Sequence, residues 1–444
     1  MRYYVGVDWA DAAHAIWVVD EAGQRVTART VAHSAEGLSE WGRELDEWRA
    51  QAIELWAAIE RPEGRVVDFL LDHGVVVYPL NPKALDRARD RFRQSGAKSD
   101  PFDARVAADF LRTDQGHLTA LQPSSAAAQE LKYLTEDCQR LIRQQTRLLN
   151  QLTATLKAYY PRALEVAELP TALARAFLAA YPTPEALSQL TERQWQRWAR
   201  AQHVSASRTA ELWSVLHAPQ LPVPAHVVRA KARLMRTLVA ALEPVLAAVG
   251  SYREAIDDFF AGMPAAATAR TLPVGDRGLL VPTLWARLGD APGRWSSFRH
   301  LQAQAGSVPV TERSGRQHRI HFRYACDKTL RYILDHLAFR SLQTSDWARA
   351  YYDQQRARGH GHRQALRALG AKWLKIIFVM WRDDVAYSEE HHLATIARQQ
   401  LRCSVPKLFV NRSPAGCAHS KGPTTPAAQP PPPMPPARLH ARRS

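Results

Sequence analysis

The sequence predicts an α/β domain at the N-terminus and a mainly helical remainder. Short β-rich runs alternate with helical patterns over the first 125 residues, and from Ala126 onward the apolar periodicity is helical only. The 444 residues include 46% hydrophobic and 23% charged residues, which is the composition of a globular protein. At roughly 100–200 residues per domain, this length predicts two or three domains.

The first elements are expected to be strands, followed by alternating helices and strands. The expected strands are residues 3–9, 15–20, 25–31, 53–59 and 75–80. The expected helices are residues 38–48, where apolar residues recur at spacings of three and four, and residues 66–71. The last two strands are almost wholly apolar, which is typical of a partly parallel sheet covered on both faces. Three strands followed by αβα units is the order of a ribonuclease-H-like fold.

Two long helices with an approximate heptad pattern are expected in the middle of the chain. They cover residues 131–159 and 228–256, and Pro244 is expected to kink the second. A helical hairpin, a dimerising coiled coil and two ordinary amphipathic helices of one monomer all fit this pattern. A further helix is expected from Asp327 to Leu342. The end of the chain, 420–444, is Pro-rich and basic, without the capacity to form a core.

These patterns define four expected regions. They are residues 1–125 (α/β), 126–265 (helical, coiled-coil-like), 266–395 (mainly helical) and 396–444 (a disordered basic tail).

The charge balance predicts a polyanionic partner. Lys and Arg number 59 against 43 Asp and Glu, a formal net charge of +16. A protein this basic commonly binds nucleic acid, because neutralised phosphates release their counterions. A basic, solvated surface without such a partner is the plainer alternative.

Other composition features exclude several classes of protein. No run of 18 apolar residues occurs, so no membrane span is expected, and the start MRYYVGVDWA lacks the pattern of a secretory signal. The four cysteines lie far apart without CxxC spacing, so a disulfide framework is not expected. A reducing cytoplasm fits this composition.

Four carboxylates are candidates for one catalytic centre. Asp8 lies in an apolar strand, where an acidic residue is costly unless it is paired or binds a metal. Glu60 ends a buried strand, where open α/β sheets place ligands. Asp100, expected as an N-cap before Pro101, and Asp103 open a helix, which by itself requires no function.

A ribonuclease-H-like sheet would bring these four carboxylates together. The first strand, the fourth strand and a later helix converge at one point in that fold. Carboxylates meeting there would repel one another unless a cation held them, and oxygen ligands suit Mg²⁺. Two such ions can assist the attacking and the leaving oxygen of a phosphodiester.

Ser314 is a second candidate, in a loop-like segment reading RSGRQHR. A serine before glycine lets the backbone approach a phosphate closely. Donors suited to phosphate oxygens surround it in the sequence: Arg313, Arg316, His318, Arg319 and Arg323. A turn serine in a basic, nucleic-acid-contacting loop is the plainer alternative, since no adjacent base is evident to activate the hydroxyl.

The ordered motifs VGVDWA, AAIERP, KSDPFDARVAADFL and AGSVPVTERSGRQHRIHFRYACDKTLR resemble the insertion sequence 110 family of DEDD transposases. The resemblance implies a RuvC-like domain carrying Asp8, Glu60, Asp100 and Asp103, and a separate transposase domain carrying Ser314. It implies Mg²⁺-dependent DNA strand exchange through a transient serine–DNA phosphodiester. It also implies a homodimer or homotetramer, a guide RNA encoded beside the gene, and a cytoplasmic, nucleoid-associated location.

Two other functions remain open from the sequence. A metal-dependent, structure-specific nuclease would use water instead of Ser314 and leave free DNA ends. A non-catalytic DNA- or RNA-binding protein on the same scaffold would show no metal-dependent strand breakage.

Overall fold

The computed structural model describes residues 1–92, 99–274, 278–291, 293–314 and 317–404, with side chains to residue 398. The chain divides into two compact units, Met1–Glu389 and Glu390–Ser444. Of the second unit, residues 390–404 are described, and they belong to helix α17 (Glu389–Ser404). Most of the expected tail, 396–444, and the candidate Arg316 therefore lie outside the described residues.

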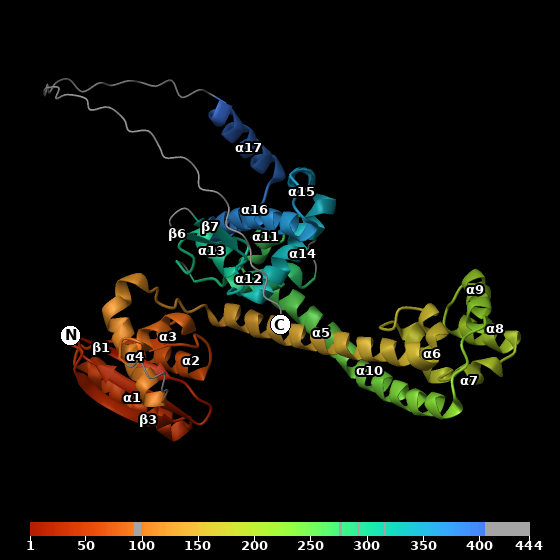
Figure 1. Ribbon diagram of the computed structural model, residues 1–444, viewed down its shortest axis with the longest axis horizontal. Coiled ribbons are helices and arrows are strands. Elements are labelled where there is room, and N and C mark those ends of the chain that lie inside the picture. The colour runs from red at the N-terminus through yellow and green to blue at the C-terminus, as the bar shows by residue number, and fades with distance from the viewer. Residues whose placement is uncertain (93–98, 275–277, 292, 315–316, 405–444) are drawn as a thin grey trace, which may run out of the picture. The chain divides into compact units, whose positions relative to one another are not determined.

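A five-stranded sheet with the order β3-β2-β1-β4-β5 forms the N-terminal part (Figure 1). Its strands are β1 (Arg2–Asp8), β2 (Ala13–Val19), β3 (Arg25–Ala32), β4 (Glu54–Ile59) and β5 (Val76–Pro79). The first three strands are antiparallel, whereas β4 runs parallel to β1 and β5 parallel to β4. All five expected strands are confirmed, with ends shifted by no more than two residues. The order and directions are those of a ribonuclease-H-like sheet.

Helices cover both faces of this sheet. They are α1 (Ala35–Ala50), α2 (Arg65–Asp72), α3 (Pro82–Arg89) and α4 (Asp100–Asp114). Trp41 and Leu70, from α1 and α2, share a core with Val5 of β1. Phe102 of α4 shares a second core with Tyr4, the neighbour of Val5 in β1. Since adjacent strand residues point to opposite faces, the two helix pairs cover opposite sides of the sheet.

Two long helices, α5 (Ala126–Tyr159) and α10 (Ala225–Ala261), pack along each other within the chain (Figure 1). Leu152 of α5 and Leu242 of α10 belong to one core, and Cys138 and Ile256 to another. The structure thus shows the intramolecular pairing among the expected alternatives. The helix α10 runs uninterrupted through Pro244.

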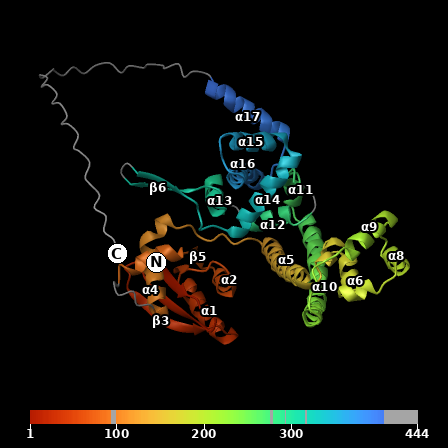
Figure 2. The same cartoon turned by 45° about the vertical axis from the view of Figure 1, so that its right-hand side comes forward.

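Short helices lie where α5 ends and α10 begins (Figure 2). They are α6 (Ala172–Ala180), α7 (Pro184–Ser188), α8 (Glu192–Ala201) and α9 (Ala206–His217). A group of aromatic side chains, including Phe177, Trp195 and Trp213, packs within this region.

Among the described helices, α10 alone is long and apolar enough to cross a membrane by length and composition. Its buried residues pack in the two cores shared with α5. We therefore interpret α10 as a helix that packs on α5 within the chain.

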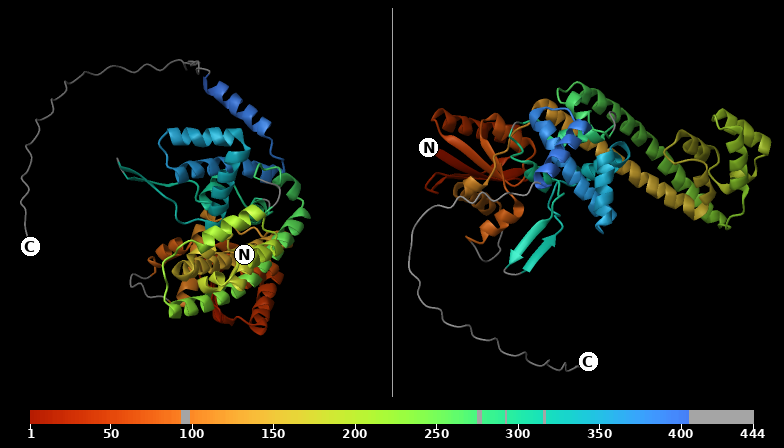
Figure 3. Two further views of the ribbon diagram at one scale, coloured as in Figure 1. Left: turned by 90° about the vertical axis from the view of Figure 1, so that its right-hand side faces the viewer. Right: turned by 90° about the horizontal axis from the view of Figure 1, so that it is seen from above.

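The third region is mainly helical. Its helices are α11 (Ala266–Ala269), α12 (Leu280–Leu288), α13 (Phe298–Gln304), α14 (Lys328–Thr344), α15 (Asp346–Ala357) and α16 (His362–Asp383). Trp373 of α16 and Leu337 of α14 are buried in its core. The segment expected as a loop around Ser314 is instead a hairpin of β6 (Val310–Ser314) and β7 (Gln317–His321), which the right-hand view of Figure 3 shows. The strand β6 begins with the β-branched Val310 and Thr311, residue types that favour strand structure.

Candidate active site

Asp8 and Glu60 lie at the carboxyl ends of two neighbouring parallel strands. Asp8 is the last residue of β1, and Glu60 directly follows β4. Because Val7 pairs with Ile59, the two carboxylates come next in the same register. Alternation along the strands places both on the face that α4 covers, the side of Gly6 and Ala58.

The helix α4 packs directly on β1 because Gly6 has no side chain. A Cβ atom at Gly6 would lie 1.8 Å from the carbonyl oxygen of Ala104, so only glycine allows this approach. The close contact brings the first turn of α4, with Asp100 and Asp103, to the end of β1. The N-cap of α4 is Ser99, so the expectation that Asp100 is the N-cap is wrong by one residue. The cause is that Asp100 and Pro101 both already lie in the first turn.

The electrostatics of Asp8 show that the four candidate carboxylates lie near one another. Burial, followed by the charges of Asp103, Asp100 and Glu60, raises the pKa of the Asp8 carboxyl to about 6. Asp8 is half-buried, whereas Glu60 and Asp100 are exposed. Three acidic groups that act on a half-buried carboxyl at the end of a strand disfavour its negative charge, and a nearby cation would favour it.

Arg89, at the C-terminal end of α3, binds Asp103. Its Nε donates to Oδ1 of Asp103 at 2.7 Å and its Nη2 to Oδ2 at 2.9 Å, a two-pronged ion pair. The side chains of Arg89 and Asp103 are only 14% and 13% exposed. The positive charge of Arg89 also opposes the rise in the pKa of Asp8. Sequence analysis missed Arg89, since nothing in a one-dimensional pattern links it to a carboxylate on the next helix.

The donor set fits a divalent cation in its chemistry, but it is not assembled as a coordination shell. Among the described residues, no group of three or more His, Cys, Asp or Glu side chains lies close enough to hold a metal ion. Oxygen-only donors whose mutual repulsion raises the pKa of Asp8 are nevertheless the type that binds Mg²⁺. Asp103 meets the guanidinium of Arg89 instead.

The residues that follow Asp8 and Glu60 contact each other on the other face of the sheet. The guanidinium carbon of Arg61, which follows Glu60, lies 4.8 Å from the ring centre of Trp9, which follows Asp8. Such cation–π contacts stabilise by about 0.5–2 kcal/mol, depending on exposure. The Trp9 ring stacks in turn on the fully buried His14. Each of the motifs VGVDWA and AAIERP therefore contains one of the two carboxylates and, directly after it, one partner of this cation–π contact.

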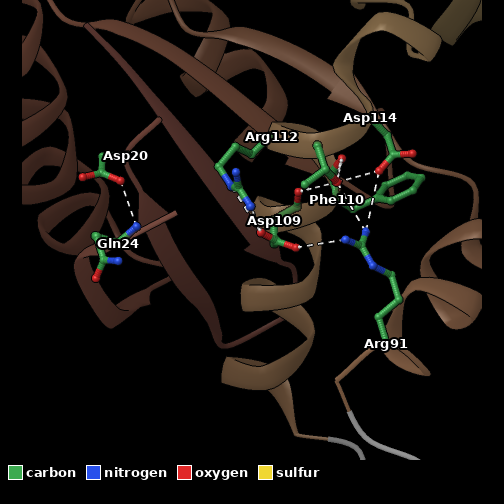
Figure 4. A network of polar contacts seen from close by, with 8 residues as sticks. Asp20, Gln24, Arg91, Asp109, Phe110, Arg112 and Asp114 are labelled. Carbon is green, nitrogen blue, oxygen red and sulfur yellow. Dashed lines mark hydrogen bonds and ion pairs between the residues drawn. The ribbon is translucent and has the colours of Figure 1, made fainter. Parts of the chain in front are cut away.

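Carboxylates farther along α4 are neutralised by arginines, in contrast to Asp8. Asp109 binds Nη2 of Arg112 at 2.6 Å and lies 3.9 Å from Arg91, which also approaches Asp114 (Figure 4). Asp20, at the end of β2, accepts a hydrogen bond from the backbone N–H of Gln24 within its turn. These acidic groups therefore have structural roles.

Ser314 is the last residue of β6, at the tip of the hairpin. It pairs with Gln317 across the strands, and both are exposed. No described residue makes a hydrogen bond with its hydroxyl group. The side chain of Ser314 is accessible to solvent.

The basic residues predicted around Ser314 divide between the two faces of the hairpin. Register places Arg319, opposite Glu312, on the face of Ser314, and places Arg313 and His318 on the other face. Arg323 is half-buried and its Nε donates to the carbonyl oxygen of Val308 at 3.3 Å. Arg313, His318 and Arg319 are exposed and available to phosphate groups.

Comparison with known proteins agrees with this arrangement. A family model described as a transposase, of the DEDD type found in IS110, matches residues 5–161. A second model, for the transposase IS116/IS110/IS902 family, matches residues 275–353. The α/β site lies within the first match and the hairpin within the second.

Several relatives match the chain over most of its length. A Streptomyces coelicolor protein named as a mini-circle putative transposase for IS117 is 30% identical over 84% of this chain and 92% of its own length. A 43.6 kDa protein of insertion element IS110 from the same organism is 26% identical over 86% and 95%. A 42 kDa protein of insertion element IS900 from Mycobacterium paratuberculosis is 25% identical over 86% and 96%.

The fold, the carboxylate cluster and these matches define a DNA-recombining enzyme of the transposase class. The chain belongs to the IS110 family of transposases.

Proposed function

We propose that this transposase exchanges DNA strands through a covalent bond between Ser314 and DNA, assisted by Mg²⁺ held at Asp8, Glu60, Asp100 and Asp103. In this proposal the N-terminal domain is RuvC-like. The observation that carries the cation site is the raised pKa of Asp8, which burial and then the charges of the three other carboxylates cause together at the carboxyl ends of β1 and β4. Three acidic residues, up to 95 positions away in the sequence, act on Asp8 at the end of its strand.

The residues of the chain have separate tasks in this reaction. The Ser314 oxygen forms a bond to phosphorus while the bond from phosphorus to the leaving deoxyribose oxygen breaks, and the serine proton is transferred to a base. A deoxyribose hydroxyl of another strand then attacks the same phosphorus and releases Ser314. Arg319 lies on the face of Ser314, where its guanidinium can hold phosphate oxygens. A divalent cation, when bound, would neutralise the carboxylates and stabilise the charge on the phosphate.

The partners of the reaction are part of the proposal. DNA of the element ends and of the target is the substrate, and the net charge of +16 suits a nucleic-acid ligand. The resemblance to the family supports a guide RNA encoded beside the gene and a homodimer or homotetramer. Ser314 has no activating group among its described neighbours, which supports a site completed by another subunit.

A denaturing gel tests the nucleophile. Purified protein is mixed with Mg²⁺, labelled element-end DNA and the RNA transcribed beside the gene. We expect a labelled protein–DNA adduct that is absent from Ser314→Ala. The matched control is Thr311→Ala, which removes another exposed hydroxyl of the same strand and should keep the adduct.

The other lanes separate the alternatives. Cleavage without an adduct would instead establish the nuclease that uses water. An adduct in Ser314→Ala would overturn the assignment of the nucleophile. Omission of the RNA should abolish the adduct, and omission of Mg²⁺ should do the same.

A further inference from the structure

A basic cavity lies between α5, α10, α12 and α14, apart from both the carboxylates and Ser314. Its volume is about 760 Å³, and no acidic residue occurs among the described residues that line it. The lining residues that carry a positive charge are Arg143, Arg253, Lys328 and Arg340, and His336 lies among them. They come from three helices, so the tertiary fold gathers charges that the sequence disperses.

These cations lack carboxylate partners. No described carboxylate lies within ion-pair distance of Arg143, Arg253 or Lys328, and all three side chains are exposed. In a neighbouring pocket the opposite holds, since Arg287 binds Glu136 at 2.9 Å and Lys132 binds Glu63 at 2.8 Å. The cavity therefore keeps its positive charge, whereas the positive charges of Lys132 and Arg287 in the other pocket are neutralised by carboxylates.

An aromatic platform stands beside the charges. Tyr332 of α14 is 61% exposed, and its ring lies 4.2 Å from the ring of His336, one helical turn away. A large aromatic side chain left in water beside unpaired arginines suits a ligand with both phosphates and π faces. Successive bases of single-stranded nucleic acid stack on such side chains.

The size of the cavity favours single-stranded over double-stranded nucleic acid. Its volume lies in the range of sites that hold one small organic molecule. A few nucleotides fit such a space, whereas a duplex does not. Because a transposase separates and rejoins DNA strands, single-stranded DNA is a form of nucleic acid that its own reaction supplies.

We propose that this cavity binds a short stretch of single-stranded DNA, with Arg143, Arg253 and Lys328 on the phosphates and Tyr332 under a base. The proposal rests on the transposase family and not on Ser314 or the carboxylates. Ser314→Ala and Asp8→Ala should therefore bind the strand as the wild type does, so this inference and the proposed mechanism can fail separately.

The test is binding of the full chain to a short labelled oligothymidylate, followed by fluorescence anisotropy in EDTA. The double variant Arg143→Glu/Arg253→Glu is compared with Arg229→Glu/Arg233→Glu, which changes two exposed arginines of α10 outside the cavity. Both variants change the formal charge equally. We expect the first to bind at least about tenfold more weakly than the second. Its log–log salt dependence should be shallower by about 0.7 for each phosphate that is no longer neutralised.

Tyr332 provides a second, independent test of the proposal. Tyr332→Ala should weaken binding about fivefold or more, since stacking on one aromatic side chain is worth roughly 1–3 kcal/mol per base. All of these side chains are exposed, so the variants should keep the wild-type melting temperature. Equal losses of affinity in the two double variants, or an unchanged affinity in Tyr332→Ala, would overturn the proposal. A loss seen with an RNA strand but not with the DNA strand would assign the cavity to RNA and overturn it as well.

Discussion

At the scale of single residues, Arg89 neutralises Asp103, one of the four candidate carboxylates. Its two hydrogen bonds to Asp103 satisfy one of the four acidic groups in the absence of a cation. Arg89→Ala leaves a largely buried carboxylate without its partner, which should lower the free energy of unfolding by about 1–3 kcal/mol. A cation can then replace the guanidinium, so Mg²⁺ should raise the melting temperature of Arg89→Ala more than that of the wild type.

The control for this experiment lies on the neighbouring loop. Arg91→Ala removes an exposed arginine near Asp109 and Asp114, away from the cluster (Figure 4). It should be nearly neutral and show no added response to Mg²⁺. If Mg²⁺ shifted the melting temperatures of both variants equally, Arg89 would not compete with a cation for Asp103.

Asp8 makes cation binding dependent on pH. Its pKa of about 6 lies above the ordinary 3.8, because burial and three nearby carboxylates disfavour its charge. Between these two values the folded state holds more protons than the unfolded state. The contribution of Asp8 to stability is therefore present at low pH and is lost as pH rises through this range.

The affinity for Mg²⁺ has the opposite pH dependence and rises with pH, because the cation binds the ionised carboxylate. Its apparent affinity should fall up to about tenfold per pH unit below pH 6 and level off above it. Melting curves with and without Mg²⁺ measure this, and the stabilisation should be small about one pH unit below the pKa of Asp8 and complete well above it. A stabilisation that is equal on both sides of this pKa would show that Asp8 does not contribute to the cation site.

At the scale of elements, the contact of α4 with β1 depends on Gly6. The Cβ of Gly6→Ala would meet the backbone of Ala104, which cannot rotate away as a side chain can. The helix must shift, at a cost of at least about 1–3 kcal/mol. The shift should also separate Asp100 and Asp103 from Asp8, so strand exchange should fall by more than the reduced stability explains. Melting temperature and recombination yield, measured on the same preparation, check the two effects.

A matched glycine provides the control. Gly116→Ala introduces a Cβ with no atom within 4 Å, just after the end of α4. It should retain both the melting temperature and the activity. Full activity in Gly6→Ala would show that the position of α4 on β1 does not determine the site.

The elements themselves follow from local patterns, whereas their contacts do not. Apolar runs predicted the buried strands of the sheet, because burial leaves a strong signal at residues such as Val5 or Ala57. The mostly exposed β3 was predicted as the run that follows the turn-like residues 21–23. The hairpin was missed, since every residue of β7 is exposed and carries no apolar alternation against a core. Asp8 and Glu60 were predicted together because the first and fourth strands of a ribonuclease-H-like sheet converge at one point. Arg89 was missed because its pairing depends on how α3 packs against α4.

At the scale of the whole molecule, we predict a site shared between subunits, because no described residue makes a hydrogen bond with the hydroxyl of Ser314. Asp8→Ala and Ser314→Ala should each abolish strand exchange while binding to DNA is largely kept. In a twofold oligomer with shared sites, mixing the two proteins rebuilds one intact site in each mixed dimer, which is about a quarter of all sites after random exchange. The measurement is the adduct or recombination yield after the two variants are unfolded and refolded together, or coexpressed.

With both groups supplied by one subunit, no mixed dimer would contain an intact site and the yield would stay at zero. The double variant Asp8→Ala/Ser314→Ala, mixed with the wild type, controls for dilution, because its mixed dimers retain an intact site only if both groups come from one subunit.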